Sequence, residues 1–233
     1  MNNPVPHDPY RALRFRDFRM LLAGGVISSL GGQMMSLAIG WEIYERTRSA
    51  FALGMVGLVQ LMPVILLVLV TGHVADRYNR QTIILLSKLV AIAASLGLAA
   101  LSYTQGPTLA IYGCLLILGI GSAFNMPASS GLPAQVLPEE AFENSATWTT
   151  SVMTLASVAG PAIGGLIIAT VGRATVVYLL NALAAMIYIG VLLSIRSQYA
   201  TAHGTLDNQE KLSVRFLLEG VAFMRRTPVI FSA

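Results

Sequence analysis

The chain has 233 residues, of which 55% are hydrophobic and only 11% charged, and its formal net charge at pH 7 is +4. An ordinary soluble domain carries roughly 25% charged residues, so this composition excludes that class and indicates an integral membrane protein. The three histidines and one cysteine do not have metal-ligand spacing, so we expect no metal site and no cofactor.

Six long runs with almost no charged residues predict six transmembrane helices. A helix rises about 1.5 Å per residue, so roughly 20 apolar residues cross the hydrocarbon core of a bilayer, and each run reaches that length. The predicted spans are residues 20–41, 51–75, 83–103, 108–127, 146–171 and 174–195. We therefore expect an all-α membrane protein whose six-helix transmembrane domain covers residues 20–195.

The segment before the first span, residues 1–19, carries four arginines and is expected to be a basic cytoplasmic terminus. The first span has an apolar core of about 22 residues. This exceeds the roughly 7–15 residues of a cleavable signal peptide, so the span itself should act as the insertion signal. Glu42 follows at the outer end of the span, where it is either a charge at the headgroup level or a candidate proton site.

The loop between the second and third spans, residues 72–81, places Gly72, Asp76, Arg77 and Arg80 between two long apolar runs. If it were solvated, the pair formed by Asp76 and Arg77 would contribute only about 0–1 kcal/mol to stability. The loop is therefore more informative as a motif than as an ion pair.

The fifth span contains Gly160, Pro161, Gly164 and Gly165. With Ala156, two of these glycines recur every four residues and form a face of small residues that allows another helix to approach closely. The proline should add a kink. Such faces are common in membrane proteins, so the spacing by itself predicts helix packing.

The chain becomes more polar after the sixth span. Residues 196–228 are expected to form a cytoplasmic linker with an amphipathic helix, because apolar residues recur at helical spacing among charged ones. Residues 229–233 are mostly apolar and follow Pro228, which is typical of the start of a seventh span. We therefore expect the sequence to be incomplete relative to the working protein.

The distribution of basic residues predicts the orientation in the membrane. With the N-terminus in the cytoplasm, twelve basic residues lie on cytoplasmic segments and three, Arg46, Arg48 and Arg173, lie on outer loops. This asymmetry follows the positive-inside rule. The basic charge is therefore a topology signal, and no nucleic-acid partner is expected.

A short internal sequence repeat relates the two halves of the chain, because residues 79–84 resemble residues 172–177 at an offset of 93. The first segment joins spans two and three, and the second joins spans five and six, so the repeat unit is three helices. Because three is odd, the two copies should be inverted, as in many secondary transporters. The matched segments are short, and a chance match is the alternative.

Residues 72–81 resemble the loop motif G-x-x-x-D-R-x-G-R-[RK] of major facilitator superfamily transporters. The matching positions are Gly72, Asp76, Arg77 and Arg80. Asn79 stands in place of the second glycine, and Gln81 in place of the last basic residue. Asparagine is the usual replacement for glycine at positive φ, so we expect the turn to survive.

Residues 160–165 resemble the fifth-span motif of antiporters in this superfamily, with Ala156 in place of its first glycine. The fourth-span arginine pattern of these antiporters is absent, because Leu115 precedes Gly119. Further segments resemble the branch that exports siderophores and macrolides. These segments are residues 41–44, 47–49, 124–128, 137–140 and 144–146.

The resemblance implies a twelve-span transporter in the bacterial inner membrane, of which this chain is the N-terminal six-span half and whose C-terminal half is a missing partner. It also implies export of a small amphiphilic molecule, a siderophore or a drug, by alternating access, with the 72–81 loop in the gate. Proton coupling is left open, because the fourth-span arginine pattern is absent. Polar residues of the pathway-lining spans then become candidates for substrate contact: Gln33, Gln60 and Asn125. Interhelical hydrogen bonds, worth ~0.6 kcal/mol on average, are the alternative explanation for these three side chains. A coupling proton would be carried by Glu42 or by the other half.

A second hypothesis is a truncated or self-pairing half without independent transport activity. Six spans do not easily enclose a path that the family builds from twelve. An enzyme is not expected, because the sequence offers no nucleophile–base pair, metal cluster or phosphate-binding loop.

Overall fold

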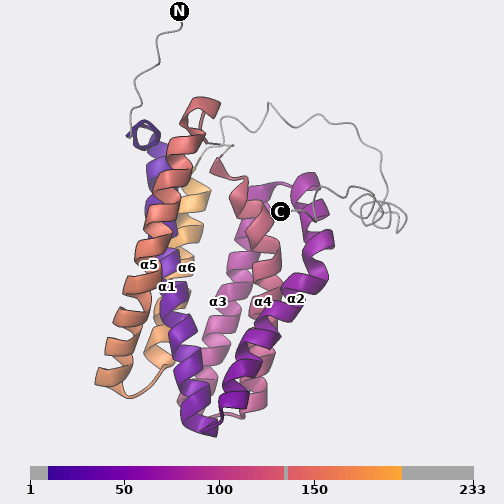
Figure 1. The fold of residues 1–233 in the computed structure, drawn as a ribbon, viewed down its shortest axis with the longest axis vertical. Coiled ribbons are helices and arrows are strands. Elements are labelled where there is room, and N and C mark those ends of the chain that lie inside the picture. The colour runs from indigo at the N-terminus through magenta and orange to yellow at the C-terminus, as the bar shows by residue number, and fades with distance from the viewer. Residues whose placement is uncertain (1–9, 134–135, 196–233) are drawn as a thin grey trace, which may run out of the picture. The chain divides into compact units, whose positions relative to one another are not determined.

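The computed structural model describes residues 10–133 and 136–195. The predicted linker at 196–228 and the predicted start of a seventh span at 229–233 lie outside the described residues, as do residues 1–9 of the basic terminus. Six α-helices and two short 3-10 turns form the regular structure of the described part, which contains no strand. The elements are η1 (Ala12–Arg14), α1 (Arg16–Thr47), α2 (Ala50–Arg77), α3 (Arg80–Thr104), α4 (Thr108–Ser130), η3 (Glu139–Ala141), α5 (Phe142–Val171) and α6 (Thr175–Ser194) (Figure 1).

All six helices are long and apolar enough to cross a bilayer, which confirms the predicted all-α fold. The largest difference from the predicted bounds is in α1, which begins at Arg16 and continues to Thr47. The helix extends through Glu42 and Arg46 because these two charged side chains, four residues apart, pair with each other. The placement of Arg46 on an outer loop was therefore wrong, since this residue belongs to the last turns of α1.

The connection between α2 and α3 corrects one backbone expectation. Asn79 has φ −60° and does not adopt the positive φ that the motif glycine suggested. Its side chain instead caps α3, because Asn79 Oδ1 accepts a hydrogen bond from the Gln81 backbone N–H at 2.9 Å. Gly172, the counterpart of Asn79 in the internal repeat, has φ +71° and ends α5. The two copies therefore differ in backbone conformation at this position.

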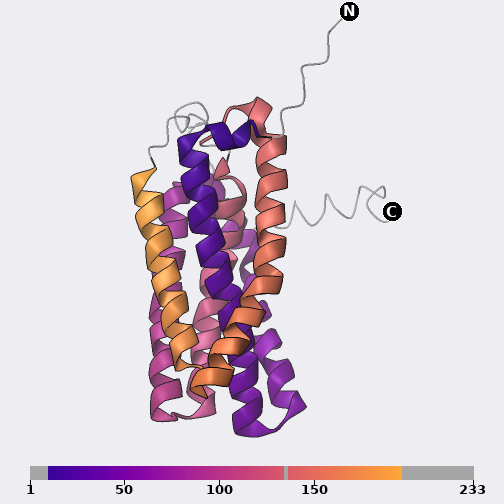
Figure 2. The ribbon, with the colours of Figure 1, turned by 90° about the vertical axis from the view of Figure 1, so that its left-hand side faces the viewer.

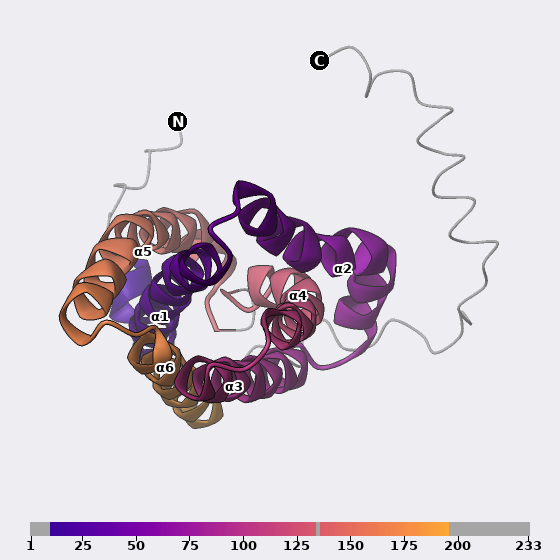
Figure 3. The same cartoon turned by 90° about the horizontal axis from the view of Figure 1, so that it is seen from below.

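The repeats α1–α3 and α4–α6 occupy equivalent positions in the bundle. Helix α1 packs against α5 and α6, whereas α4 packs against α2 and α3. Exchanging α1 with α4, α2 with α5 and α3 with α6 leaves this pattern unchanged, and the contact between α3 and α6 maps onto itself. The structure thus confirms two inverted three-helix repeats. Figure 2 shows α1 between α5 and α6, and Figure 3 shows α2 and α5 on opposite flanks of the bundle.

Buried apolar side chains form two clusters, one toward each end of the bundle. We call the end at which residues 77–80 join α2 to α3 the motif end, at the top of Figure 1. The end at which residues 104–108 join α3 to α4 is the network end. The motif-end cluster includes Phe18, Ile84, Leu137 and Leu192, and the network-end cluster includes Ile39, Ile43, Leu98 and Leu115.

Glycines allow the central helices to approach their neighbours closely. A Cβ built at Gly119 of α4 would lie 2.6 Å from the Gln60 carbonyl oxygen of α2. A Cβ built at Gly31 of α1 would lie 2.9 Å from the Ala184 Cβ of α6. Because real Cβ atoms do not approach other atoms so closely, a side chain at either position would push the helices apart.

Candidate functional site

The residues of the 72–81 loop motif lie at the motif end. Gly72, Asp76 and Arg77 belong to the last turns of α2, and Arg80 is the first residue of α3. The Arg80 guanidinium lies over Gly131, the C-cap of α4, so that a Cβ built there would overlap it. A Cβ built at Gly72 meets no atom of the described residues within 4 Å. The motif thus reaches the ends of three helices, while Gly72 faces open space.

The fifth-span motif packs against α1. A Cβ built at Gly160 would lie 2.5 Å from the Gln33 Cβ, and one built at Gly164 would lie 3.1 Å from a Cα atom of α1. Gly165 leaves more room, because its Cβ would be 3.4 Å from the nearest side chain. Pro161 lies inside α5 between these contacts. The small residues therefore face a close helix crossing, as their spacing predicted.

The three candidate pathway residues, Gln33, Gln60 and Asn125, are partly buried and lie on α1, α2 and α4. Their side chains make no interhelical hydrogen bonds within the described residues, so no hydrogen bond joins the three. Asn125 differs from the others because its Oδ1 atom is buried without a hydrogen-bond partner. A buried acceptor of this kind is usually satisfied by water or by a ligand.

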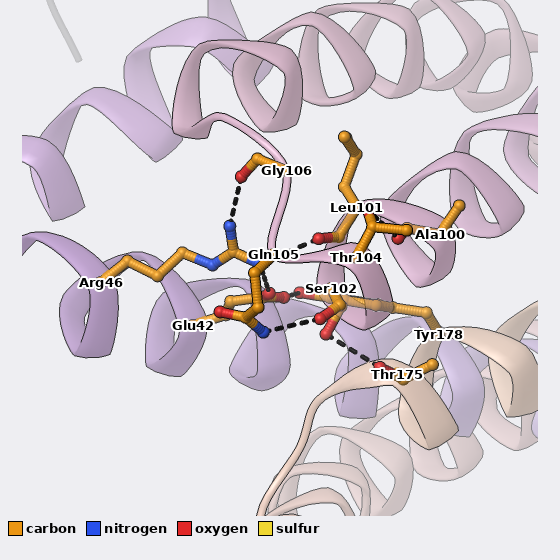
Figure 4. A network of polar contacts seen from close by, with 10 residues as sticks. All are labelled: Glu42, Arg46, Ala100, Leu101, Ser102, Thr104, Gln105, Gly106, Thr175 and Tyr178. Carbon is orange, nitrogen blue, oxygen red and sulfur yellow. Dashed lines mark hydrogen bonds and ion pairs between the residues drawn. The ribbon is translucent and has the colours of Figure 1, made fainter.

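Glu42 lies at the network end in a buried polar cluster (Figure 4). Its Oε1 accepts a hydrogen bond from Arg46 Nη2 at 2.5 Å, and its Oε2 accepts one from the Tyr178 hydroxyl at 2.7 Å. Arg46 also donates to the Leu101 carbonyl at 3.1 Å and to the Gly106 carbonyl at 2.6 Å. Glu42 is only 4% exposed and Tyr178 is fully buried, so the cluster is shielded from solvent.

Further hydrogen bonds extend this cluster across the helices. The Thr175 hydroxyl donates to Ser102 Oγ at 3.0 Å, and Gln105 Nε2 donates to the Ser102 carbonyl at 2.8 Å. Together with the contacts of Glu42, these bonds join α1, α3, α6 and the α3–α4 connection (Figure 4). The arrangement satisfies nearly all of its polar groups and holds the network end together.

Lys88 is a second polar residue inside the bundle. Its Nζ donates to Ser28 Oγ at 2.8 Å and lies 5.0 Å from the centroid of the Tyr188 ring. Lys88 follows Arg80, the first residue of α3, by eight positions, or about 12 Å along the helix axis. It forms no ion pair within the described residues, so α1, α3 and α6 surround an ammonium group without a carboxylate partner.

A cavity of about 320 Å³ lies at the motif end, and Tyr188, which contacts this lysine, is one of its lining residues. We call it the motif-end chamber; side chains of α1, α4 and α5 line it, together with Tyr188 of α6. Its walls are mainly apolar, with hydroxyl groups from Ser129, Ser130 and Thr149. Gly25 leaves room in it, because a Cβ built at this residue meets nothing within 4 Å. The volume is in the range of small-molecule sites.

The exposed face of α5 carries hydroxyl groups that the sequence analysis missed. They line an open depression at the motif-end half of the helix, and they belong to Thr147, Thr150, Ser151 and Thr154. Glu143 lies one turn before them and is exposed. The signal was present in the sequence, because these residues are spaced three and four apart within the fifth span. Arg46 was also missed as a partner of Glu42, although it lies four residues away on the same helix.

Comparison with known proteins gives matches over most of the chain. Residues 7–230 match the family model described as "Transmembrane secretion effector", MFS_3. The macrolide efflux protein A of Streptococcus pyogenes is 26% identical over 220 residues, which are 92% of this chain and 53% of that protein. The uncharacterised MFS-type transporter YfiS of Bacillus subtilis is 25% identical over 216 residues, which are 91% of this chain and 50% of that protein.

A third relative, the multidrug efflux pump Tap of Mycobacterium tuberculosis, is 26% identical over 168 residues, which are 69% of this chain and 40% of the pump. This chain therefore spans about half the length of the relatives that it matches.

Proposed function

The chain belongs to the major facilitator superfamily of transporters, and we propose from this membership that it forms the N-terminal half of an exporter of small amphiphilic molecules. The family and the matched relatives are transporters and not enzymes. With its six long apolar helices, the chain is a multi-pass membrane protein. The observation that carries the export proposal is the match to efflux proteins. The match to macrolide efflux protein A covers 92% of this chain, and the match to the pump Tap covers 69%.

The proposed mechanism is alternating access, in which this half rocks against a C-terminal six-helix half around a central path. Support comes from the two inverted repeats and from α2 and α5, each of which packs mainly against one neighbour and lies on a flank. Phe51, Leu66 and Leu155 are exposed on these flanking helices. We propose that the flanks meet the second half, and that the exposed hydroxyl face of α5 lines the path.

The 72–81 loop is proposed to contact the other half and to hold one gate closed. The open space at Gly72 supports this, because no described atom requires a glycine there. The contact of Arg80 with Gly131 couples the loop to the end of α4, so a movement of the loop would also displace the end of this pathway-lining helix. The close crossing at Gly160 and Gly164 would keep α1 and α5 together during this movement.

The positive-inside charge distribution supports a cytoplasmic N-terminus, and we propose the bacterial cytoplasmic membrane as the location. The motif end would then face the cytoplasm. Proton coupling is part of the proposal, but the contacts of Glu42 favour a fixed ion pair over a proton site. Its two oxygens already accept hydrogen bonds from Arg46 and Tyr178. We therefore assign the coupling proton to the half that this chain lacks.

The test is efflux from cells that express the protein extended by its C-terminal half. A panel of siderophores and macrolides would be offered with and without a protonophore, and the Asp76→Asn variant and a protein ending at Ala233 would be compared. We expect protonophore-sensitive efflux that both changes abolish. Full efflux by the protein ending at Ala233 would instead support the self-pairing half, and no efflux of any compound would refute the export proposal.

The Glu42→Gln variant separates the two readings of that residue. A fixed ion pair predicts lower stability and lower efflux at every proton gradient, because Arg46 loses its charged partner. A proton site predicts a stable protein whose efflux no longer responds to the protonophore. The second result would show that the proton site lies in this half of the transporter.

A further inference from the structure

Lys88 lies well inside the bundle and forms no ion pair within the part of the chain that the structure describes. The buried carboxylate of Glu42 in α1 is, by contrast, neutralised by Arg46. The Lys88 ammonium instead has a hydroxyl partner, Ser28 Oγ at 2.8 Å, and the face of an aromatic ring, Tyr188 at 5.0 Å. Both partners stabilise a positive charge but do not cancel it.

The interior of the described bundle therefore carries an uncompensated positive charge at the motif end. Ionisable groups inside a membrane protein are costly, and they are usually kept for a function. Lys88 does not extend to the lipid headgroups, because its Nζ is directed toward α1 and α6. The charge thus acts on whatever enters the space beside these helices.

That space is the motif-end chamber, and Tyr188 connects it to Lys88. The Tyr188 ring contributes to the chamber wall and also lies next to the Lys88 ammonium. The chamber wall contains no acidic side chain among its lining residues. Two of its hydroxyls, those of Ser129 and Ser130, already donate to backbone carbonyls of α4, so neither is available to donate to an anionic ligand, and the attraction for an anion has to come from Lys88.

We propose that the motif-end chamber binds an amphiphile whose charged group is an anion, and that Lys88 makes the site reject lipophilic cations. This inference rests on the proposed export function, since it names the substrate class of that path. The apolar walls would hold the hydrocarbon or aromatic body. The anionic group would lie on the side of Tyr188, where the field of Lys88 is strongest.

The size of the effect depends on how far the charged group of the ligand lies from Lys88 Nζ. Two unit charges about 10 Å apart at an effective dielectric constant of about 20 interact strongly enough to change affinity by roughly tenfold. An anion gains this factor and a cation loses it. The two ligands of a matched pair should therefore differ by roughly tenfold to a hundredfold in dissociation constant.

The experiment uses the full-length transporter, purified in detergent, and equilibrium dialysis with two probes. The probes are 2-naphthoate and 2-naphthylmethyltrimethylammonium, which share an aromatic body and differ in the sign of their charge. We expect tighter binding of the anion to the unmodified protein. Lys88→Gln should remove the preference, and Lys88→Arg should keep it.

Two further variants locate the effect. Arg173→Gln removes one exposed positive charge at the network end and should leave the preference unchanged. Gly25→Leu should weaken binding of both probes, because its side chain would occupy chamber space. Equal binding of the two probes to the unmodified protein, or a preference that survives Lys88→Gln, would overturn the proposal.

The outcome is separable from that of the export proposal. Efflux without a charge preference would refute the role of Lys88 alone. Charge-selective binding without efflux would refute export and leave the anion site standing. The elution profile of each variant in size-exclusion chromatography shows whether it folds, and Lys88→Arg supplies a variant that retains the charge.

Discussion

Arg46→Met should be the most damaging single substitution in the buried cluster around Glu42. The Arg46 guanidinium donates to Glu42 Oε1 at 2.5 Å, to the Gly106 carbonyl at 2.6 Å and to the Leu101 carbonyl at 3.1 Å. The two charged side chains are only 13% and 5% exposed, so water screens them little. Removing one member of a buried pair costs about 3–5 kcal/mol, because the remaining charge stays buried.

The assay is titration of the purified full-length protein with sodium dodecyl sulfate in mixed micelles, which reports the free energy of unfolding. We expect a loss of about 3–5 kcal/mol for Arg46→Met. Tyr178→Phe removes one hydrogen bond to a charged group and should cost about 1.5–3 kcal/mol. Glu45→Gln is the control, because its pair with Arg48 is exposed and should contribute about 0–1 kcal/mol.

A double variant completes the test. Glu42→Leu together with Arg46→Met leaves no buried charge, so it should be less destabilised than the sum of the two single changes. Strict additivity, or a loss below about 1 kcal/mol for Arg46→Met, would show that the pair is not a buried ion pair. Either result would refute the conclusion that this cluster stabilises the network end.

Three further outcomes are expected. Gly119→Ala should lower the free energy of unfolding by about 1–3 kcal/mol, because its Cβ would lie 2.6 Å from a carbonyl of the facing helix. Gly57→Ala, whose Cβ meets nothing within 4 Å, should not lower the free energy of unfolding in the same titration. Equal losses of stability for the two variants would contradict the packing argument. Asn79→Ala should cost about 0.5–2 kcal/mol through loss of the α3 cap, whereas an unchanged unfolding curve would speak against that cap. In a Cys114→Ala background, Thr150→Cys should react with a membrane-impermeant maleimide applied from the cytoplasmic side, and protection until the protein is denatured would exclude a water-exposed face.

The number of helices could be predicted because a bilayer imposes a minimum length on each apolar run, and no tertiary information is needed to count such runs. The end of α1 could not be predicted from hydropathy alone. Glu42 looked like the end of the helix because a single charge is costly in the membrane, but its partner Arg46 removes most of that cost. A pair of opposite charges four residues apart inside a boundary region is the signal that was available.

The candidate site was predicted only in part. The close packing of Gly160 and Gly164 followed from their spacing, because small residues on one face allow helices to approach. The bond between Tyr178 and Glu42 joins residues 136 positions apart, and nothing local to either residue indicates it. The inward direction of Lys88 was equally hidden, because it depends on which faces of α1 and α6 meet α3.

The contact between α3 and α6 maps onto itself when the repeats α1–α3 and α4–α6 are exchanged. It is therefore equivalent to the contact on the axis of the isologous interface of a twofold homodimer, joined here into one chain. Two copies of a three-helix protein, inserted into the membrane in opposite directions, would meet here and along the contacts of α1 with α5 and α6 and of α4 with α2 and α3. A residue of α3 at this contact thus faces the equivalent residue of α6. We therefore expect a larger side chain at one of these paired positions to be compensated by a smaller side chain at the other.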